Sequence, residues 1–99
     1  KWYNSTTMTE VLGGLRQPEL SLSEKEIAKR GRDYNRVLRS LSPEQQGVIT
    51  ELTSVLSEWD IYQQYRGNVE KVEDLSMSLS LIGLRKNQRR IVLRYLNLS

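Results

Sequence analysis

The longest regular pattern of apolar positions lies between Ser42 and Arg66. Apolar residues recur there at alternating spacings of four and three, which places them on one face of an α-helix; they are Val48, Leu52, Val55, Trp59 and Tyr62. Ser42 and Gln45 form a capping box around Pro43 at the first helical position, and Gly67 can end the helix. The pattern predicts one long central helix with Trp59 as its largest core side chain.

A second helix is predicted from Ser23 to about Ser40. Ser23 and Glu26 have capping-box spacing. The apolar row of this helix consists of Ile27, Gly31, Tyr34, Leu38 and Leu41, and Gly31 suggests the close approach of another helix. The link to the central helix is very short, so the two helices are predicted to form an antiparallel hairpin. Five residues are expected to anchor the core of the domain: Trp59, Tyr62, Tyr34, Leu38 and Leu52.

The C-terminal third allows two interpretations. Residues 75–81 alternate between apolar and polar, which is typical of a strand, and residues 91–98 are also compatible with a strand. However, Asn68 can cap a helix that carries Glu70, Glu73 and Asp74 in its first turns, where the helix dipole favours anions. No Asn-Gly or Asp-Gly turn connects the two runs. We therefore favour a fourth helix that ends near Gly83 and a fifth from about residue 85 to 98.

These elements predict an all-α fold, a small bundle of four to five helices around the long central helix. The alternative is three helices followed by a C-terminal β-hairpin. A further short helix is predicted around Met8, Val11, Leu12 and Leu15, before Pro18. Ninety-nine residues suit a single domain covering residues 1–99, and Lys1 in place of an initiating Met suggests a piece of a longer chain.

The composition argues against most catalytic chemistry. The chain has no Cys and no His, which removes the commonest nucleophile–base pairs and the commonest metal ligands. It contains no phosphate-binding glycine loop and no Gly-x-Ser-x-Gly elbow. No apolar run approaches the ~20 residues that span a bilayer. We predict a non-enzymatic protein without a cofactor, a metal or a transmembrane segment.

Basic residues form two groups that could bind polyanions. The first group follows the face of the second helix opposite its apolar row, and the second lies in the predicted fifth helix; the members are Lys25, Lys29, Arg32, Arg36 and Arg39, and Lys86, Arg89, Arg90 and Arg94. The run LRKNQRRIVLRYL, from Leu84 to Leu96, resembles the first helix of the DNA-binding region of bacterial sigma factors. This resemblance implies nucleic-acid binding, although the net charge of only +3 favours weak and non-specific binding.

The apolar rows suggest a different function, the binding of another protein. Glu44, Glu51 and Glu58 lie seven residues apart along one border of the central apolar row, where charges select partners in helical interfaces. Apolar surface that is rimmed by charge is typical of a helix-binding surface. The sequence therefore predicts a protein–protein interaction or scaffold module that binds another protein or a second copy of itself. Nucleic-acid binding through the basic residues is the alternative.

Overall fold

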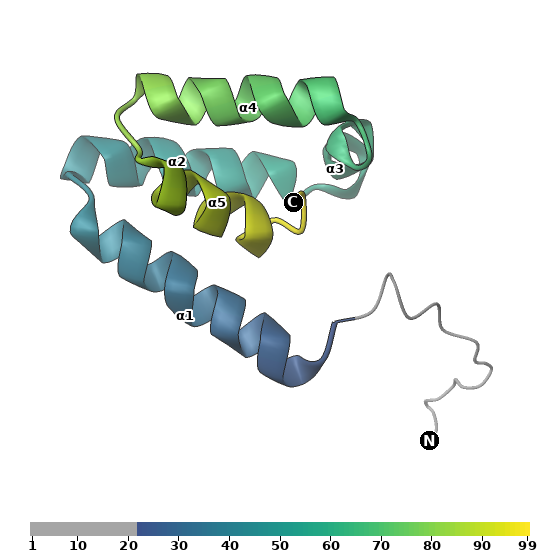
Figure 1. Ribbon diagram of the computed structural model, residues 1–99, viewed down its shortest axis with the longest axis horizontal. Coiled ribbons are helices and arrows are strands. Elements are labelled where there is room, and N and C mark those ends of the chain that lie inside the picture. Colours follow the sequence, from purple (N-terminus) through teal and green to yellow (C-terminus); the bar gives the residue numbers. More distant parts are fainter. Residues whose placement is uncertain (1–21) are drawn as a thin grey trace.

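The computed structural model describes residues 22–99, which form five helices and no strand. The helices are α1 (Glu24–Ser40), α2 (Pro43–Leu56), α3 (Trp59–Tyr65), α4 (Val69–Leu81) and α5 (Lys86–Tyr95) (Figure 1). The prediction of a small all-α bundle is confirmed. Residues 75–81 are helical despite their alternating pattern, so the β-hairpin alternative is wrong. The short helix predicted around residues 8–15 lies outside the described residues.

The predicted helix starts agree with the structure. The Ser42 side chain accepts a hydrogen bond from the Gln45 amide at 3.1 Å, and the Gln45 side chain accepts one from the Ser42 amide at 3.0 Å. Ser23 and Asn68 accept equivalent bonds at the starts of α1 and α4. Each cap satisfies a backbone N–H group that has no partner within its own helix. Local sequence therefore determines where α1, α2 and α4 begin.

The long central helix is broken, contrary to the prediction. Near the end of α2, the amides of Ser57 and Glu58 bond to carbonyls three residues back, and the Ser57 hydroxyl donates to the Thr53 carbonyl at 2.6 Å. Such side-chain bonds compete with helical backbone bonds. Glu58 then takes an extended conformation, with φ −72° and ψ 133°, and becomes the N-cap residue of α3. Trp59 therefore begins a new helix, and it no longer shares a face with Val48.

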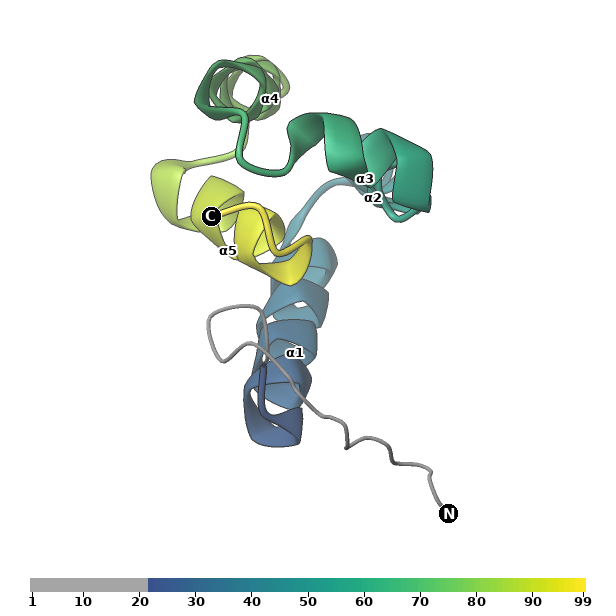
Figure 2. The same cartoon turned by 90° about the vertical axis from the view of Figure 1, so that its right-hand side faces the viewer.

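Helix α1 has its most extensive contact with α5 and a smaller one with α2. Figure 1 shows α1 diverging from α2 beyond their short connection, so the predicted antiparallel hairpin is wrong. Gly31 also has no neighbour within 4 Å of an added Cβ atom, so it does not mark a close approach of helices. Figure 2 shows α5 beside α1, with α4 on the other side of α5. Helix α5 thus connects α1 to the rest of the bundle.

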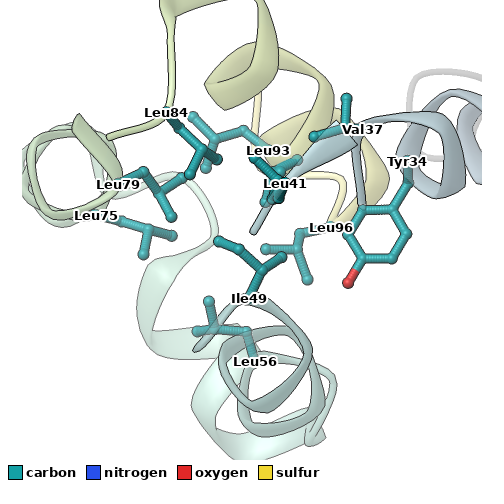
Figure 3. Packing of buried hydrophobic residues seen from close by; sticks show 11 residues of the cluster. Tyr34, Val37, Leu41, Ile49, Leu56, Leu75, Leu79, Leu84, Leu93 and Leu96 are labelled. Carbon is teal, nitrogen blue, oxygen red and sulfur yellow. The ribbon is translucent and has the colours of Figure 1, made fainter. Parts of the chain in front are cut away.

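The core lies where α2, α4 and α5 converge on the C-terminal half of α1 (Figure 3). Ile49, Leu79 and Val92 are its most deeply buried side chains. The remaining buried apolar residues are Tyr34, Val37, Leu41, Leu56, Leu75, Leu84, Leu93 and Leu96. Burying these side chains supplies the main favourable free energy of folding.

The predicted core anchors take different positions. Tyr34 is buried, and its hydroxyl shares a 3.0 Å hydrogen bond with the Thr53 hydroxyl. Leu38 and Leu52 are half-buried and pack against the core. Tyr62 is half-buried and donates from its hydroxyl to the Asn97 carbonyl at 3.2 Å. The prediction for Trp59 is wrong, since 67% of this residue is exposed.

Candidate interaction surfaces

An open apolar groove lies between α2 and α4. Its volume is about 310 Å³. The two helices do not pack directly against each other: no Cα atom of α2 lies within 8 Å of a Cα atom of α4. The groove is lined by Val48, Leu52, Tyr65, Lys71, Asp74, Leu75, Ser78, Leu79 and Ile82. Most of these side chains are apolar, and Val48 remains 49% exposed. The groove is therefore apolar surface that the chain's described part leaves open.

A hydrogen bond joins the two walls of the groove at the end where α2 begins. The Gln45 side chain, which caps α2, also donates to the Ile82 carbonyl at the end of α4 at 2.9 Å. Gly83 adopts φ +102°, a conformation that favours glycine, and a Cβ atom there would lie 2.8 Å from the Gln45 side-chain nitrogen. Gly83 thus allows the chain to leave α4 beside Gln45. One residue, Gln45, joins the start of α2 to the end of α4.

The opposite end of the groove is lined by Tyr65 at the end of α3 and by Lys71 in the first half of α4. The Lys71 ammonium group lies 4.8 Å from the centre of the Tyr65 ring, within the range of a cation–π interaction. Lys71 is the basic residue among the side chains that line the groove. The groove is thus closed at one end by the hydrogen bond from Gln45 to Ile82 and has the positive charge of Lys71 at the other end.

Acidic residues border the groove on both sides. On α4, Asp74 lines the groove directly. On α2, Glu51 follows Val48 by three residues and precedes Val55 by four, so it neighbours both on the helix surface. Glu44 precedes Val48 by one turn, and both glutamates are exposed. Glu58, the third predicted border residue, is instead the N-cap residue of α3. The predicted acidic border therefore persists only along α2.

Further exposed apolar residues lie on α4. Met77 is 63% exposed and Leu81 is 80% exposed, and they lie one turn apart on the same face. They flank Ser78, which lines the groove. An apolar surface of this kind, continuous with a groove and bordered by charge, is typical of protein-binding sites. The apolar surface available to a partner is thus wider than the groove itself.

The basic row on α1 is partly neutralised within the helix. Lys29 and Arg36 both pair with Asp33, at 3.1 and 3.4 Å. The hydrogen bond from Lys29, supported by the charges of Lys29, Arg36 and Arg32, lowers the pKa of the Asp33 carboxyl group. Lys25, Arg32 and Arg39 are exposed. Asp33 was not among the predicted site residues, although its spacing of four from Lys29 is the usual spacing of a helical ion pair.

Arg30 was not among the predicted site residues, yet it joins α1 to the end of α5. Its guanidinium group pairs with Glu26 at 3.1 Å and donates to the Arg94 carbonyl at 2.9 Å and the Asn97 side chain at 3.3 Å. These bonds satisfy acceptors at the C-terminal end of α5, where cations are favoured. The contact joins residues 64 apart in the sequence, so spacing alone could not reveal it.

Helix α5 brings its basic residues close to part of the α1 row. A second cavity of about 200 Å³ lies between the helices, lined by Glu26, Lys29, Arg30, Asp33, Arg90, Ile91 and Arg94. Arg89 instead donates to the Leu84 carbonyl at 2.8 Å, and Lys86 is exposed outside this cavity. The structure thus gathers Lys29, Arg90 and Arg94 in one place, together with two carboxylates.

The charges of the described residues separate into two regions. Helices α1 and α5 with their N-cap residues carry eleven Lys and Arg but only three Asp and Glu. Residues 43–84, which contain α2, α3 and α4, carry seven Asp and Glu but only Arg66 and Lys71 as basic residues. The modest net charge of +3 therefore conceals a basic region and an acidic region.

Comparisons with protein families, with curated proteins and with solved structures found no match for this chain. Within residues 22–99, no helix is long and apolar enough to cross a membrane.

Proposed function

We propose that this protein is a non-enzymatic interaction module that binds a helical segment of another protein in the groove between α2 and α4. The observation that carries this proposal is the open apolar lining of the groove. Leu75 and Leu79 belong to the core, and Leu52 and Val48 extend the same apolar surface outward to solvent. Covering such a surface releases water from it, and this release would favour binding.

The shape of the groove favours a helix as the bound element. Both walls are helices, and α4 has 13 residues, which corresponds to about 20 Å at ~1.5 Å per residue. This length matches three to four turns of a partner helix. An added strand would require a sheet edge, and residues 22–99 contain no sheet. A helix that presents apolar residues at spacings of three and four would meet the apolar lining of the groove.

A titration monitored by NMR tests the proposal. The probe is a designed amphipathic helical peptide with leucines on one face and uncharged glutamines flanking them. We expect resonance changes along the groove, at Leu52, Ser78 and Ile82. The variant Val48→Gln should weaken binding about threefold to tenfold, since it removes apolar area from the lining. Val69→Gln is the matched control, because Val69 is 70% exposed and lies outside the groove.

Two results would contradict the proposal. One is the absence of any resonance change at millimolar peptide, which would show that the groove does not accept a helix. The other is equal weakening by Val48→Gln and Val69→Gln, which would show that the peptide binds apolar surface without preference for the groove.

Polyanion binding by α1 and α5 is the second candidate, and the gathering of Lys29, Arg90 and Arg94 around one cavity favours it. Asp33 and Glu26 oppose it, because they hold Lys29, Arg36 and Arg30 in ion pairs. Binding to single- or double-stranded DNA should therefore be weak, independent of sequence and lost with added salt. Sequence-dependent binding that persists at ~0.2 M salt would make this the better candidate.

A further inference from the structure

From the charges around the groove we infer the chemistry of its ligand: an amphipathic helix of another protein with basic residues flanking its apolar face. This inference rests on the proposed function and adds the class of partner. Asp74 lines one side of the groove, and on the other side the exposed Glu51 and Glu44 lie one turn from the lining residue Val48 on the surface of α2. A helix in the groove would place its flanking residues next to these carboxylates. Lys or Arg there would meet opposite charge, whereas Glu or Asp would meet like charge.

The surrounding region has the same sign. Residues 43–84 carry seven acidic and two basic residues, so the negative potential extends beyond the carboxylates that touch the groove. A basic partner would be attracted toward this side of the molecule before contact, and an acidic partner would be attracted toward α1 and α5. Charge therefore distinguishes the two sides of the protein for an approaching chain.

Lys71 indicates how the basic residues of the partner would be arranged. Its ammonium group lies over the Tyr65 ring at the α3 end of the groove. Cations on the partner would be repelled at that end. They are favoured instead beside Asp74 and Glu51, in the middle of the groove, and beside Glu44 near the start of α2. We therefore expect the basic residues of the partner to extend from Asp74 and Glu51 toward the end where Gln45 bonds to Ile82, and not to lie over Lys71.

A second copy of this chain is a poorer ligand. To fit the groove, α1 or α5 of the second copy would have to present an exposed row of apolar residues with basic residues on either side. The exposed face of α1 carries Lys25, Arg32 and Arg36 without an apolar row, and Ile27 is the large apolar residue of α1 that is exposed. On α5, Arg90 and Arg94 lie opposite Val92, which is fully buried in the core. A helix from a different protein can meet both requirements at once.

Three designed peptides test the inference. All share one leucine face, and the flanking positions carry Lys, Gln or Glu. We expect the Lys peptide to bind about tenfold tighter than the Gln peptide at low salt, with the Glu peptide weakest. The preference should shrink to about twofold near 0.5 M salt, because exposed charges are then screened within a few ångströms.

Variants of the full chain locate the effect. Asp74→Asn and Glu51→Gln should each reduce the preference for the Lys peptide over the Gln peptide about twofold to threefold. Glu73→Gln is the matched control. Glu73 is next to Asp74 on the same helix, but it lines a different cavity, with Val69 and Leu98. Lys71→Gln should increase binding of the Lys peptide.

The outcomes separate this inference from the proposed function. If no peptide binds, or if Val48→Gln does not weaken the binding of any peptide, the proposed function fails and the inference fails with it. If the Gln peptide binds as tightly as the Lys peptide, the inference alone fails. If light scattering shows a dimer that Val48→Gln dissociates, a second copy occupies the groove and the inferred partner is wrong. If the peptides bind only after Leu12→Asp, the ligand is the chain's own residues 8–15, which would also overturn the inference.

Discussion

The contact between α1 and α5 is closed apart from a small cavity of about 200 Å³, whereas the space between α2 and α4 is an open groove of about 310 Å³. At the closed contact, the rings of Tyr34 and Tyr95 stack with centroids 4.0 Å apart, and Arg30 bonds to the end of α5. At the open one, leucines of both helices face a groove that no described residue covers. Both regions carry apolar side chains at helical spacing. They differ in the contacts across the gap: the tyrosine stack and Arg30 hold α1 against α5, whereas the Gln45–Ile82 hydrogen bond joins α2 to α4 only where α2 begins and α4 ends.

This difference has a consequence for how each region would respond to substitution. Side chains at the closed contact and in the core determine stability, while side chains on the groove walls determine what the surface can bind. Neighbouring residues of one helix can therefore have very different effects.

The first prediction compares Ile49 with Val48. Ile49→Ala should lower the free energy of unfolding by about 2–5 kcal/mol, because this fully buried side chain would leave a cavity. Val48→Ala should cost within about 0.5 kcal/mol, since this residue is half exposed on the groove wall. Urea unfolding monitored by circular dichroism measures both changes. Equal losses would show that the groove wall is part of the core.

The second prediction concerns the hydrogen bond between the hydroxyls of Tyr34 and Thr53. Tyr34→Phe should lower the free energy of unfolding by about 0.5–1.5 kcal/mol at neutral pH. The Thr53 hydroxyl keeps its 3.1 Å bond to the Thr50 carbonyl, which limits the loss. The same substitution in a Thr53→Val background should cost less, because the bond is already absent. An unchanged cost in that background would show that packing, rather than the hydrogen bond, determines the effect.

The same hydroxyl predicts a pH dependence. Burial raises the pKa of Tyr34 in the folded protein, while its hydrogen bond with Thr53 acts in the opposite direction and is the smaller effect. As the pH rises above ~10, the unfolded chain therefore loses this proton first, and stability falls. Below pH ~10, the stabilising contribution of the protonated Tyr34 side chain is fully present. The Tyr34→Phe variant should lose less stability between pH 9 and 11 than the parent, as measured by urea unfolding; an identical loss would contradict this assignment.

The sequence predicted the type of fold and most helix starts because these depend on local residues. Asn68, Ser42 and Ser23 cap helices through bonds within one turn. Pairing of helices is not local. The α1–α5 contact depends on Arg30 and the Tyr34–Tyr95 stack, which join the two ends of the described chain.

Helix α2 shows why the face of a helix can be misjudged. Two rows overlap on it, both at spacings of four and three: one contains Val48, Leu52 and Val55, and the other contains Ile49, Thr53 and Leu56. The polar Thr53 interrupts the second row. In the structure that row is buried, because the Tyr34 hydroxyl bonds to Thr53 and removes the cost of burying it. Val48 and Leu52 of the first row line the groove, so residues predicted as core form part of the candidate binding surface.

The last and smallest expected effect concerns Trp59. Trp59→Ala should change the free energy of unfolding by less than about 1 kcal/mol, since the side chain is largely exposed and Ala is a good helix former at the start of α3. Its ring lies 6.1 Å from that of Tyr62 at a tilted angle, a contact that a single substitution removes at little cost. Thermal unfolding of this variant beside Ile49→Ala measures the difference directly. A loss of about 3–5 kcal/mol would mean that α2 and α3 form the continuous helix that the apolar row suggested, with Trp59 in the core. Trp59 also lies outside the residues that line the α2–α4 groove, so peptide binding should be unchanged in this variant.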